Sequence, residues 1–189
     1  MTMEQPPGYF KPTRQQIEGA QNSGIEDVLG TGIRLLLCGI NPGLYTAAIG
    51  KHFGRPGNRF WPTLFHSGFT PRLFSPFEQH LLLNLGIGIT NLVNRATARA
   101  DEVTDEELLE GGNILRGKVL QYKPHTVAVL GLTSFRDAFK QPKAKLGLQE
   151  MKIGTSHVWV LPNPSGLNAH FQIPQLAELF AQLRAFLKE

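Results

Sequence analysis

The chain has 189 residues, of which 41% are hydrophobic and 18% charged, a composition that supports a folded core and excludes disorder as the main state. No apolar run reaches the length of about 18 residues that a membrane helix needs, and residues 1–21 contain no apolar stretch typical of a signal peptide. The single cysteine, Cys38, cannot form an internal disulfide or a four-cysteine metal site, and the six histidines show neither HExxH nor HxH spacing. We therefore expect a cytoplasmic protein with no metal and no organic cofactor.

The formal net charge of +4 is unevenly distributed along the chain. Six of the fifteen acidic residues lie between Asp101 and Glu110, and no carboxylate occurs from Val28 to Phe77. The basic excess of the remainder favours a polyanionic partner such as nucleic acid, although the same charge could serve solubility alone.

The N-terminal residues 1–24 are rich in Pro and Gln, and we expect a polar tail with a short helix over Thr13–Ala20. A single domain is then expected over residues 25–189. Its first element is the apolar run Arg34–Cys38, which is followed by Gly39 and a Pro-Gly turn, a pattern typical of a buried strand that ends sharply.

The sequence of the middle of the chain predicts a short helix, a buried segment and one long helix. A helix is expected over Arg59–Ser67, and a second buried segment, interrupted by Gly86 and Gly88, over Leu81–Thr90. Thr104 and Glu107 have the spacing of a capping box, which predicts a helix from there to about Tyr122. This assigns the acidic cluster a structural role at a helix start rather than a metal-binding role.

The C-terminal third continues the alternation of strands and helices. The sequence predicts two more buried strands, Thr126–Leu130 and His157–Leu161. Between them it predicts a short helix over Phe135–Phe139 with Thr133 or Ser134 as its N-cap, and after them a final helix that starts at Pro174. Strands that alternate with helices predict an α/β fold, a three-layer α/β/α sandwich around a mostly parallel sheet. Ligands bind such folds at the carboxyl ends of the strands, where residues 39–57 and 162–171 form loops.

Three side chains in these loops are candidates for chemistry. Asn41 has a carboxamide that does not titrate but could hold a water, or it could serve the turn alone. Leu167 ends a stiff polar loop and could be a wedge for a base stack, or it could pack beneath the loop. Phe53 lies in a basic, glycine-rich stretch and could stack on a nucleobase or pack the loop down.

Four segments together carry a resemblance to a known family. They are GINPG at 39–43, PGNRFW at 56–61, TNLVNR at 90–95 and VWVLPNPSGL at 158–167. From about Ile25 to its end, the chain resembles the bacterial mismatch-specific uracil-DNA glycosylases (the Mug proteins), relatives of thymine-DNA glycosylase in the uracil-DNA glycosylase superfamily. The resemblance implies the uracil-DNA glycosylase fold, a monomer, and double-stranded DNA with mismatched or damaged bases as the partner.

The resemblance also implies roles for individual residues. Asn41 would position the attacking water and Phe53 would stack on the flipped base, in a pocket to which Ile40, Gly43 and Thr46 also contribute. Leu167 would fill the gap left in the duplex. Gly166 and Asn168 would lie near the unpaired guanine, and Asn163 and Ser165 would contact phosphates. Asn91 and Asp101 are possible secondary residues of the site.

Five residues at three places in the chain depart from the pattern of those relatives. Asn168-Ala169 stand where Ser-Arg is common, Asn94 replaces an aspartate, and Tyr45 and Thr46 replace two serines of the pocket wall. Loss of the arginine is expected to relax the requirement for a mismatch.

The implied reaction is hydrolysis of the N-glycosidic bond of uracil, preferentially in G·U pairs, with thymine and etheno-cytosine as further candidate substrates. Because Asn41 cannot act as a strong base, we expect a slow enzyme, and no motif indicates a Schiff-base lysine or lyase activity. The alternatives are a module that recognises flipped or mispaired bases without cleavage, and a Rossmann-like nucleotide protein. The latter is disfavoured because no GxGxxG or GxxxxGK[ST] follows the first strand. A repair enzyme of this kind is expected in the bacterial cytoplasm, associated with the nucleoid.

Overall fold

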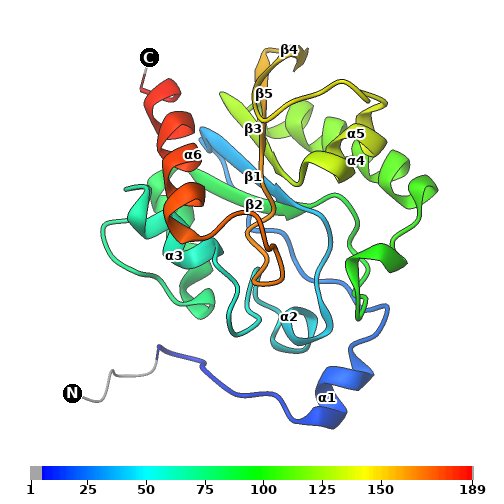
Figure 1. Cartoon of the computed structure of the whole chain (residues 1–189). Helices are drawn as coiled ribbons and strands as arrows, with labels where there is room; N and C mark the ends of the chain where they lie inside the picture. Colours follow the sequence, from blue (N-terminus) through cyan, green and yellow to red (C-terminus); the bar gives the residue numbers. More distant parts are fainter. Residues whose placement is uncertain (1–5, 189) are drawn as a thin grey trace.

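Five strands form one sheet in the order β2-β1-β3-β5-β4 in the computed structural model, which describes residues 6–188 (Figure 1). The strands are β1 (Leu35–Gly39), β2 (Ile87–Asn91), β3 (Thr126–Leu130), β4 (Gly147–Ile153) and β5 (Ser156–Leu161). The first three and β5 run parallel, and β4 pairs antiparallel with β5 at one edge of the sheet. β1 and β3 lie at the centre, where every residue is buried, as expected for parallel strands covered on both faces.

Helices cover both faces of the sheet, which confirms the three-layer α/β/α architecture (Figure 1). α4 (Asp105–Tyr122) and α5 (Leu132–Phe139) pack on one face, and α3 (Phe60–His66), α6 (Ile173–Phe186) and the 3₁₀ helix η1 (Pro76–Leu85) pack on the other. Alternate residues of β1 enter the two cores, because side chains alternate across a strand. Leu35 and Leu37 face α3 and α6, whereas Leu36 and Cys38 face α4 and α5.

Local sequence signals explain where several elements begin. Thr104 caps α4 through a capping box with Glu107, with the carboxylate accepting from the Thr104 amide at 3.0 Å. A capping box at Thr13 likewise starts α1 (Arg14–Gly19). The strands near Arg34, Thr126 and His157 and the helices near Arg59 and Pro174 form as expected, within one or two residues at their ends.

The structure corrects two local expectations. α5 begins at Leu132 with Gly131 as its N-cap, not Thr133 or Ser134, because Gly131 adopts a φ of 148° that lets the chain turn directly from strand to helix. The segment expected over 81–90 is divided at Gly86 as expected, since its φ of 70° ends η1 before β2 starts, but it is not interrupted at Gly88. Gly88 continues β2, where an added Cβ would lie only 2.9 Å from the carbonyl oxygen of Val28.

Two elements were not anticipated from the sequence: α2 (Leu44–Ile49), which lies inside the expected loop 39–57, and β4, whose half-exposed residues make no apolar run.

The N-terminal segment lies against the domain over its described part. Residues 1–5 of the expected tail lie outside the described residues. Beyond them, the rings of Tyr9 and Phe10 pack edge-on against Phe77 of η1, and α1 packs against α2 (Figure 1). The division into a tail of 24 residues and one domain stays a prediction. Within residues 6–188, none of the helices combines the length and the apolar character required to cross a membrane.

Candidate active site

The carboxyl ends of β1, β2 and β5 and the loops that follow them surround a cavity of about 430 Å³. This is the edge of a parallel sheet at which ligands are expected. Most of the candidate residues line this cavity: Ile40, Asn41, Gly43, Thr46, Phe53, Asn91, Asp101, Asn163, Ser165 and Leu167. Gly166 lines a smaller neighbouring cavity of about 200 Å³, and Asn168 lines neither.

The side chain of Asn41 is fixed by its amide nitrogen. Nδ2 donates to Thr97 Oγ1 at 2.8 Å, to the carbonyl oxygen of Arg95 at 3.0 Å and to that of Pro42 at 3.3 Å. Since all three partners accept, the nitrogen and not the oxygen must face them. Among the described residues Oδ1 has no hydrogen-bond partner, so it remains available as an acceptor in the cavity.

Thr97 is a site residue that the sequence did not indicate. Its side chain is buried, its hydroxyl donates to the carbonyl oxygen of Arg99 at 2.7 Å, and its amide donates to Pro42 at 3.2 Å. It joins the segment after β2 to the turn after β1. A threonine in an irregular loop carries no pattern of its own, so only the structure identifies it.

Phe53 forms an aromatic floor in the cavity. Its ring stacks on the fully buried Phe60 with centroids 3.9 Å apart and planes 17° apart. Its φ of 52° is uncommon for a bulky residue and indicates a backbone held in place by its surroundings. The ring also lies close to Gly39, where an added Cβ would be only 3.1 Å from Phe53 Cζ. Glycine at the end of β1 therefore makes room for this ring.

Asn91 is the last residue of β2 and lies opposite Gly39 in the sheet. It is only 7% exposed, yet its carboxamide makes no hydrogen bond to any other described side chain or backbone group, and it lines the cavity. Both a donor and an acceptor are therefore open to a ligand. The preceding Thr90 is held firmly, since its hydroxyl donates to Asp27 at 2.7 Å and accepts from Lys118 at 2.8 Å.

Two titratable groups at the cavity are already engaged. The Asp101 carboxylate, in η2 (Ala100–Glu102), forms a two-point ion pair with Arg99, and this pairing raises the pKa of the arginine. His52 is buried, its Nε2 lies 3.0 Å from the carbonyl oxygen of Glu26, and burial lowers its pKa to about 4. The imidazole is therefore neutral at pH 7 and donates from Nε2.

Ile40, Gly43 and Thr46 frame the rest of the pocket. The carbonyl oxygen of Ile40 accepts from Val93 N at 2.9 Å, so it is engaged within the fold. Gly43 is the N-cap of α2, and Thr46 is a buried residue of the same helix. Within residues 6–188, no three His, Cys, Asp or Glu side chains come together as a metal ion would require.

The loop after β5 presents Leu167 to solvent. Asn163 Oδ1 accepts from Ser165 N at 3.0 Å, and Ser165 Oγ accepts from Leu167 N at 3.2 Å. The Asn168 carboxamide is also used inside the loop, donating to the carbonyl oxygen of Asn163 at 3.0 Å. Leu167 is 78% exposed at the tip, so the interpretation that it packs beneath the loop is wrong.

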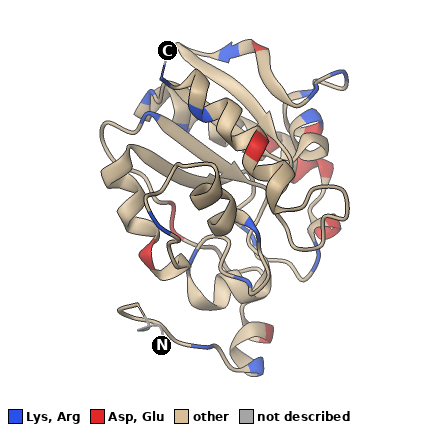
Figure 2. Cartoon of the chain, turned by 60° about the vertical axis from the view of Figure 1, so that its left-hand side comes forward, with Lys and Arg blue, Asp and Glu red and all other residues tan. Residues whose placement is uncertain are grey.

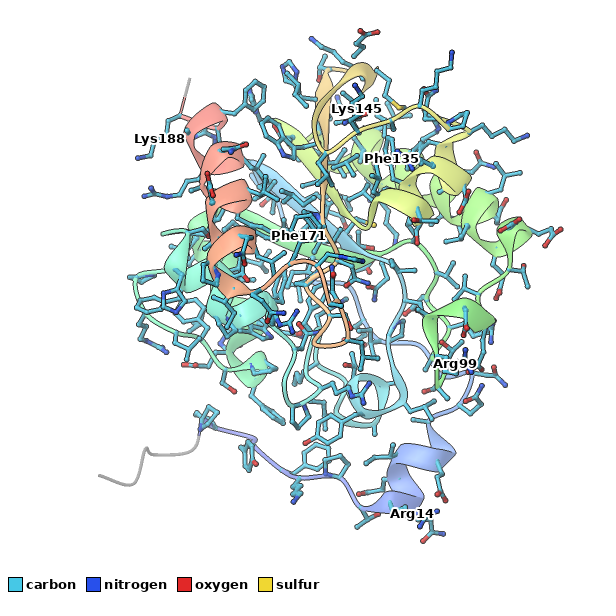
Figure 3. All side chains as sticks on the ribbon, viewed as in Figure 1. Arg14, Arg99, Phe135, Lys145, Phe171 and Lys188 are labelled. Carbon is cyan, nitrogen blue, oxygen red and sulfur yellow. The ribbon has the colours of Figure 1, made fainter. Side chains whose placement is uncertain are left out.

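Arg59 holds this loop from its inner side, a role that the sequence did not reveal. Its guanidinium donates to the carbonyl oxygens of Asn168 and Phe171 at 2.7 Å each and of Gly166 at 3.1 Å (Phe171 is labelled in Figure 3). Its backbone amide donates to Pro164 at 2.9 Å. A planar fork of donors suits several converging carbonyls, which explains why an arginine stands here.

A sequence model of the Uracil DNA glycosylase superfamily matches residues 27–188. The match contains the whole sheet and every residue that lines the main cavity, and it begins after the N-terminal segment that packs on α2.

Proposed function

The chain belongs to the uracil DNA glycosylase superfamily, whose members bind DNA and hydrolyse N-glycosidic bonds in base excision repair, and from this premise we propose a specific activity for it. It flips uracil out of duplex DNA and excises it hydrolytically, without lyase activity. Uracil opposite guanine is the preferred substrate, as in the mismatch-specific subfamily, and thymine and etheno-cytosine are further candidates.

The observation that carries this proposal is the fixed carboxamide of Asn41. With Nδ2 bound to three acceptors, Oδ1 can accept a hydrogen bond from a water and orient it toward the sugar carbon of a flipped nucleotide. A carboxamide does not take up the proton at neutral pH, so the rate gain of about 10²–10⁴ that a general base supplies is missing. The proposed enzyme is therefore slow.

The base itself would lie on Phe53. One face of that ring is covered by Phe60, which leaves the cavity side for the pyrimidine. The free carboxamide of Asn91 offers a donor and an acceptor, which complements the alternating carbonyls and N–H of the uracil edge. Donors aimed at these carbonyls also stabilise the negative charge that develops as uracil leaves.

Leu167 would occupy the gap that the flipped nucleotide leaves in the stack. An exposed leucine on a loop fixed by internal hydrogen bonds and by Arg59 suits insertion between bases. Asn163 and Ser165 shape this loop and lie where phosphates would pass, and Gly166 and Asn168 would lie near the unpaired guanine. Because mispaired bases cost less to extrude, G·U is favoured over A·U.

The test is an excision assay on end-labelled duplexes with a single G·U, A·U, G·T or normal pair, in which alkali reveals abasic sites. We expect cleavage at G·U that Asn41→Ala slows by about 100-fold, since a correctly placed water is lost. Asn113→Ala on the exposed side of α4 is the matched control and should leave the rate unchanged.

Two results would contradict the proposal. Equal rates for Asn41→Ala and the unmodified chain would remove the assigned role of Asn41. Absence of cleavage in every duplex, together with tight binding of the mismatch in a gel shift, would favour a recognition module without catalysis.

A further experiment tests the wedge. Leu167→Ala should slow excision from the duplex while single-stranded uracil DNA, which needs no wedge, is cleaved at an unchanged rate.

A further inference from the structure

The N-terminal segment, residues 6–26, makes backbone hydrogen bonds to the loop that follows β2. Asn22 N donates to the carbonyl oxygen of Ala96 at 2.9 Å, and Ala96 N donates to that of Ser23 at 2.8 Å. The two bonds form a clamp that holds both backbone groups of Ala96. Residues 22 and 23 lie before the residues 27–188 that match the superfamily, so this clamp is an addition to the matched domain.

Ala96 stands between the two residues that hold the Asn41 amide. Arg95 provides its carbonyl oxygen at 3.0 Å, and Thr97 provides its hydroxyl at 2.8 Å. A shift of Ala96 would therefore move both acceptors together. Among residues 6–188, Asn41 Nδ2 donates only to these neighbours and to the adjacent Pro42, so the clamp on Ala96 bears directly on the direction of Asn41 Oδ1.

Side chains reinforce the same junction. Asn22 Oδ1 accepts from Arg95 at 3.2 Å, and Arg95 also forms a two-point ion pair with Glu107 at the start of α4, with distances of 2.6 and 2.8 Å. The hydrogen bonds to Arg95 and to the Thr104 amide lower the pKa of Glu107 to about 2, so its carboxylate stays charged at neutral pH. The junction thus joins the N-terminal segment, the loop and the cap of α4.

The segment is itself fixed on both sides of the clamp. Before it, Ser23 Oγ donates to the carbonyl oxygen of the buried Ala20 at 2.6 Å. After it, the buried Ile25 donates its amide to Asn94 Oδ1 at 2.9 Å. Asn22 has a φ of 62°, a left-handed conformation that asparagine tolerates better than most residues. A segment held in this way can transmit a fixed position to Ala96.

We propose that the N-terminal segment positions Asn41 for catalysis through Ala96, with Asn22 as a positioning residue. The inference rests on the proposed function, because it assumes that Asn41 orients the attacking water. The segment raises the rate of the chemical step and contributes little to DNA affinity, since Asn22 and Ser23 line neither the main cavity nor the smaller cavity beside Leu167.

The test uses three full-length variants. Asn22→Pro removes the amide donor and fixes φ near −65°, which is incompatible with the observed 62°. Asn22→Gly keeps the donor and adopts positive φ freely, so it is the conservative variant that should restore most of the activity. Arg14→Ala removes only the exposed ion pair with Glu18 on α1 and is the control from the same segment (Arg14 is labelled in Figure 3). Figure 2 shows that α1 carries both basic and acidic residues.

We expect Asn22→Pro to lower the single-turnover rate on G·U duplex by about 10- to 100-fold, because small displacements of a positioning group are costly. The Kd of this variant for a duplex with non-cleavable 2′-fluoro-uracil opposite guanine should change by less than about threefold. A displaced loop after β2 impairs the chemical step, whereas the insertion of Leu167 into the duplex is unchanged. In the Asn41→Ala background the same proline should have almost no further effect, which is the signature of two residues that act through one step.

A structural defect would give a different pattern. If Asn22→Pro slowed both backgrounds equally, or left the rate unchanged, the positioning role would be overturned. Amide hydrogen exchange supplies a readout that does not depend on activity: Ala96 should exchange at least about tenfold faster in Asn22→Pro than in Asn22→Gly. If the unmodified chain cleaves nothing, the proposed function fails, and the exchange experiment alone decides whether the segment holds the loop. Equal exchange in the two variants would overturn that part too.

Discussion

Asn41 and Thr97 lie 56 residues apart in the sequence and are joined by a hydrogen bond of 2.8 Å from Nδ2 to Oγ1. The single hydroxyl proton of Thr97 is directed to the carbonyl oxygen of Arg99 at 2.7 Å, so its oxygen can only accept from Asn41. This relay of two hydrogen bonds, from Asn41 to Thr97 and from Thr97 to the carbonyl oxygen of Arg99, determines the orientation of the Asn41 carboxamide and leaves Oδ1 toward the cavity. The proposed water site therefore depends on a residue whose hydroxyl is already engaged with Asn41 and with the carbonyl oxygen of Arg99.

Replacing Thr97 with valine should test this relay, because valine has nearly the same shape and no acceptor. We expect Thr97→Val to lower the single-turnover rate on G·U duplex by about tenfold, since the half-buried Asn41 amide loses its shortest hydrogen bond and the carboxamide is held less firmly. Thr97→Ser keeps the hydroxyl and should stay close to the unmodified rate. A valine variant as fast as the serine variant would show that the relay is unimportant.

The loop after β5 depends on Arg59, and Arg59→Lys should separate its geometry from its charge. An ammonium cannot reproduce the planar fork that reaches the carbonyl oxygens of Gly166, Asn168 and Phe171. We expect excision from G·U duplex to fall by about tenfold, as several hydrogen bonds to a charged group weaken. Excision from single-stranded uracil DNA should change much less, because no wedge is needed there.

The exposed Arg14→Lys is the matched control for this substitution. An equal loss on duplex and single strand would indicate that Arg59 supports the whole domain rather than the loop.

The sequence was sufficient for the fold because the signals that define it are local. Apolar runs predicted three of the four parallel strands and gave β2 only as part of a buried segment, and the Thr104 capping box predicted the start of α4. β4 could not be found in this way, since an edge strand with alternating half-exposed residues forms few of the contacts that create an apolar run. α2 was hidden by the glycines and proline that surround it.

The candidate site was only partly visible in the sequence. Asn41, Phe53 and Leu167 stand in short, distinctive segments, and the structure brings all three to one cavity. Thr97 and Arg59 act through hydrogen bonds to residues 56 and up to 112 positions away, and no local pattern encodes such partners. Contacts of this range become visible only when the chain is folded.

Phe53 should contribute to substrate binding through the flat surface of its ring. Stacking of a base on an aromatic side chain contributes about 1–3 kcal/mol, so Phe53→Leu should weaken binding of 2′-fluoro-uracil duplex by about 10-fold or more. Phe53→Tyr keeps the ring and should bind nearly as well. Because Phe53 also packs on Phe60, thermal unfolding of both variants must be compared. Similar affinity for the leucine and tyrosine variants would argue against a stacking role.

His52 should make the stability of this region depend on pH. Burial lowers the pKa of His52 to about 4, whereas the unfolded chain has an ordinary histidine pKa near 6.5. Above pH 6.5 neither state binds the proton, and the contribution of the neutral imidazole to stability is complete. Between pH 6.5 and 4 the unfolded state binds more protons, so the free energy of unfolding should fall by about 1.4 kcal/mol per pH unit.

Two charged groups act on His52 in opposite directions, and Glu107 affects stability in a lower pH range. Asp27 and Lys118 form an ion pair at 2.6 Å and oppose each other in their effect on the imidazole. Glu107 has a pKa lowered to about 2, so its own loss of stability occurs as the pH falls below its ordinary value of 4.5. The window between pH 6.5 and 5 therefore isolates His52 from Glu107.

Urea unfolding at pH 7 and pH 5 of the unmodified chain and of His52→Gln measures this effect. Glutamine can still donate to the carbonyl oxygen of Glu26 but does not titrate, so the variant should lose about 2 kcal/mol less than the unmodified chain between these pH values. Because His52 also accepts at its carbonyl oxygen from Trp61 Nε1 and precedes Phe53, the loss should appear first as weaker binding of flipped uracil at pH 5. Parallel pH dependence in the two chains would show that His52 is protonated as readily in the folded state as in the unfolded state.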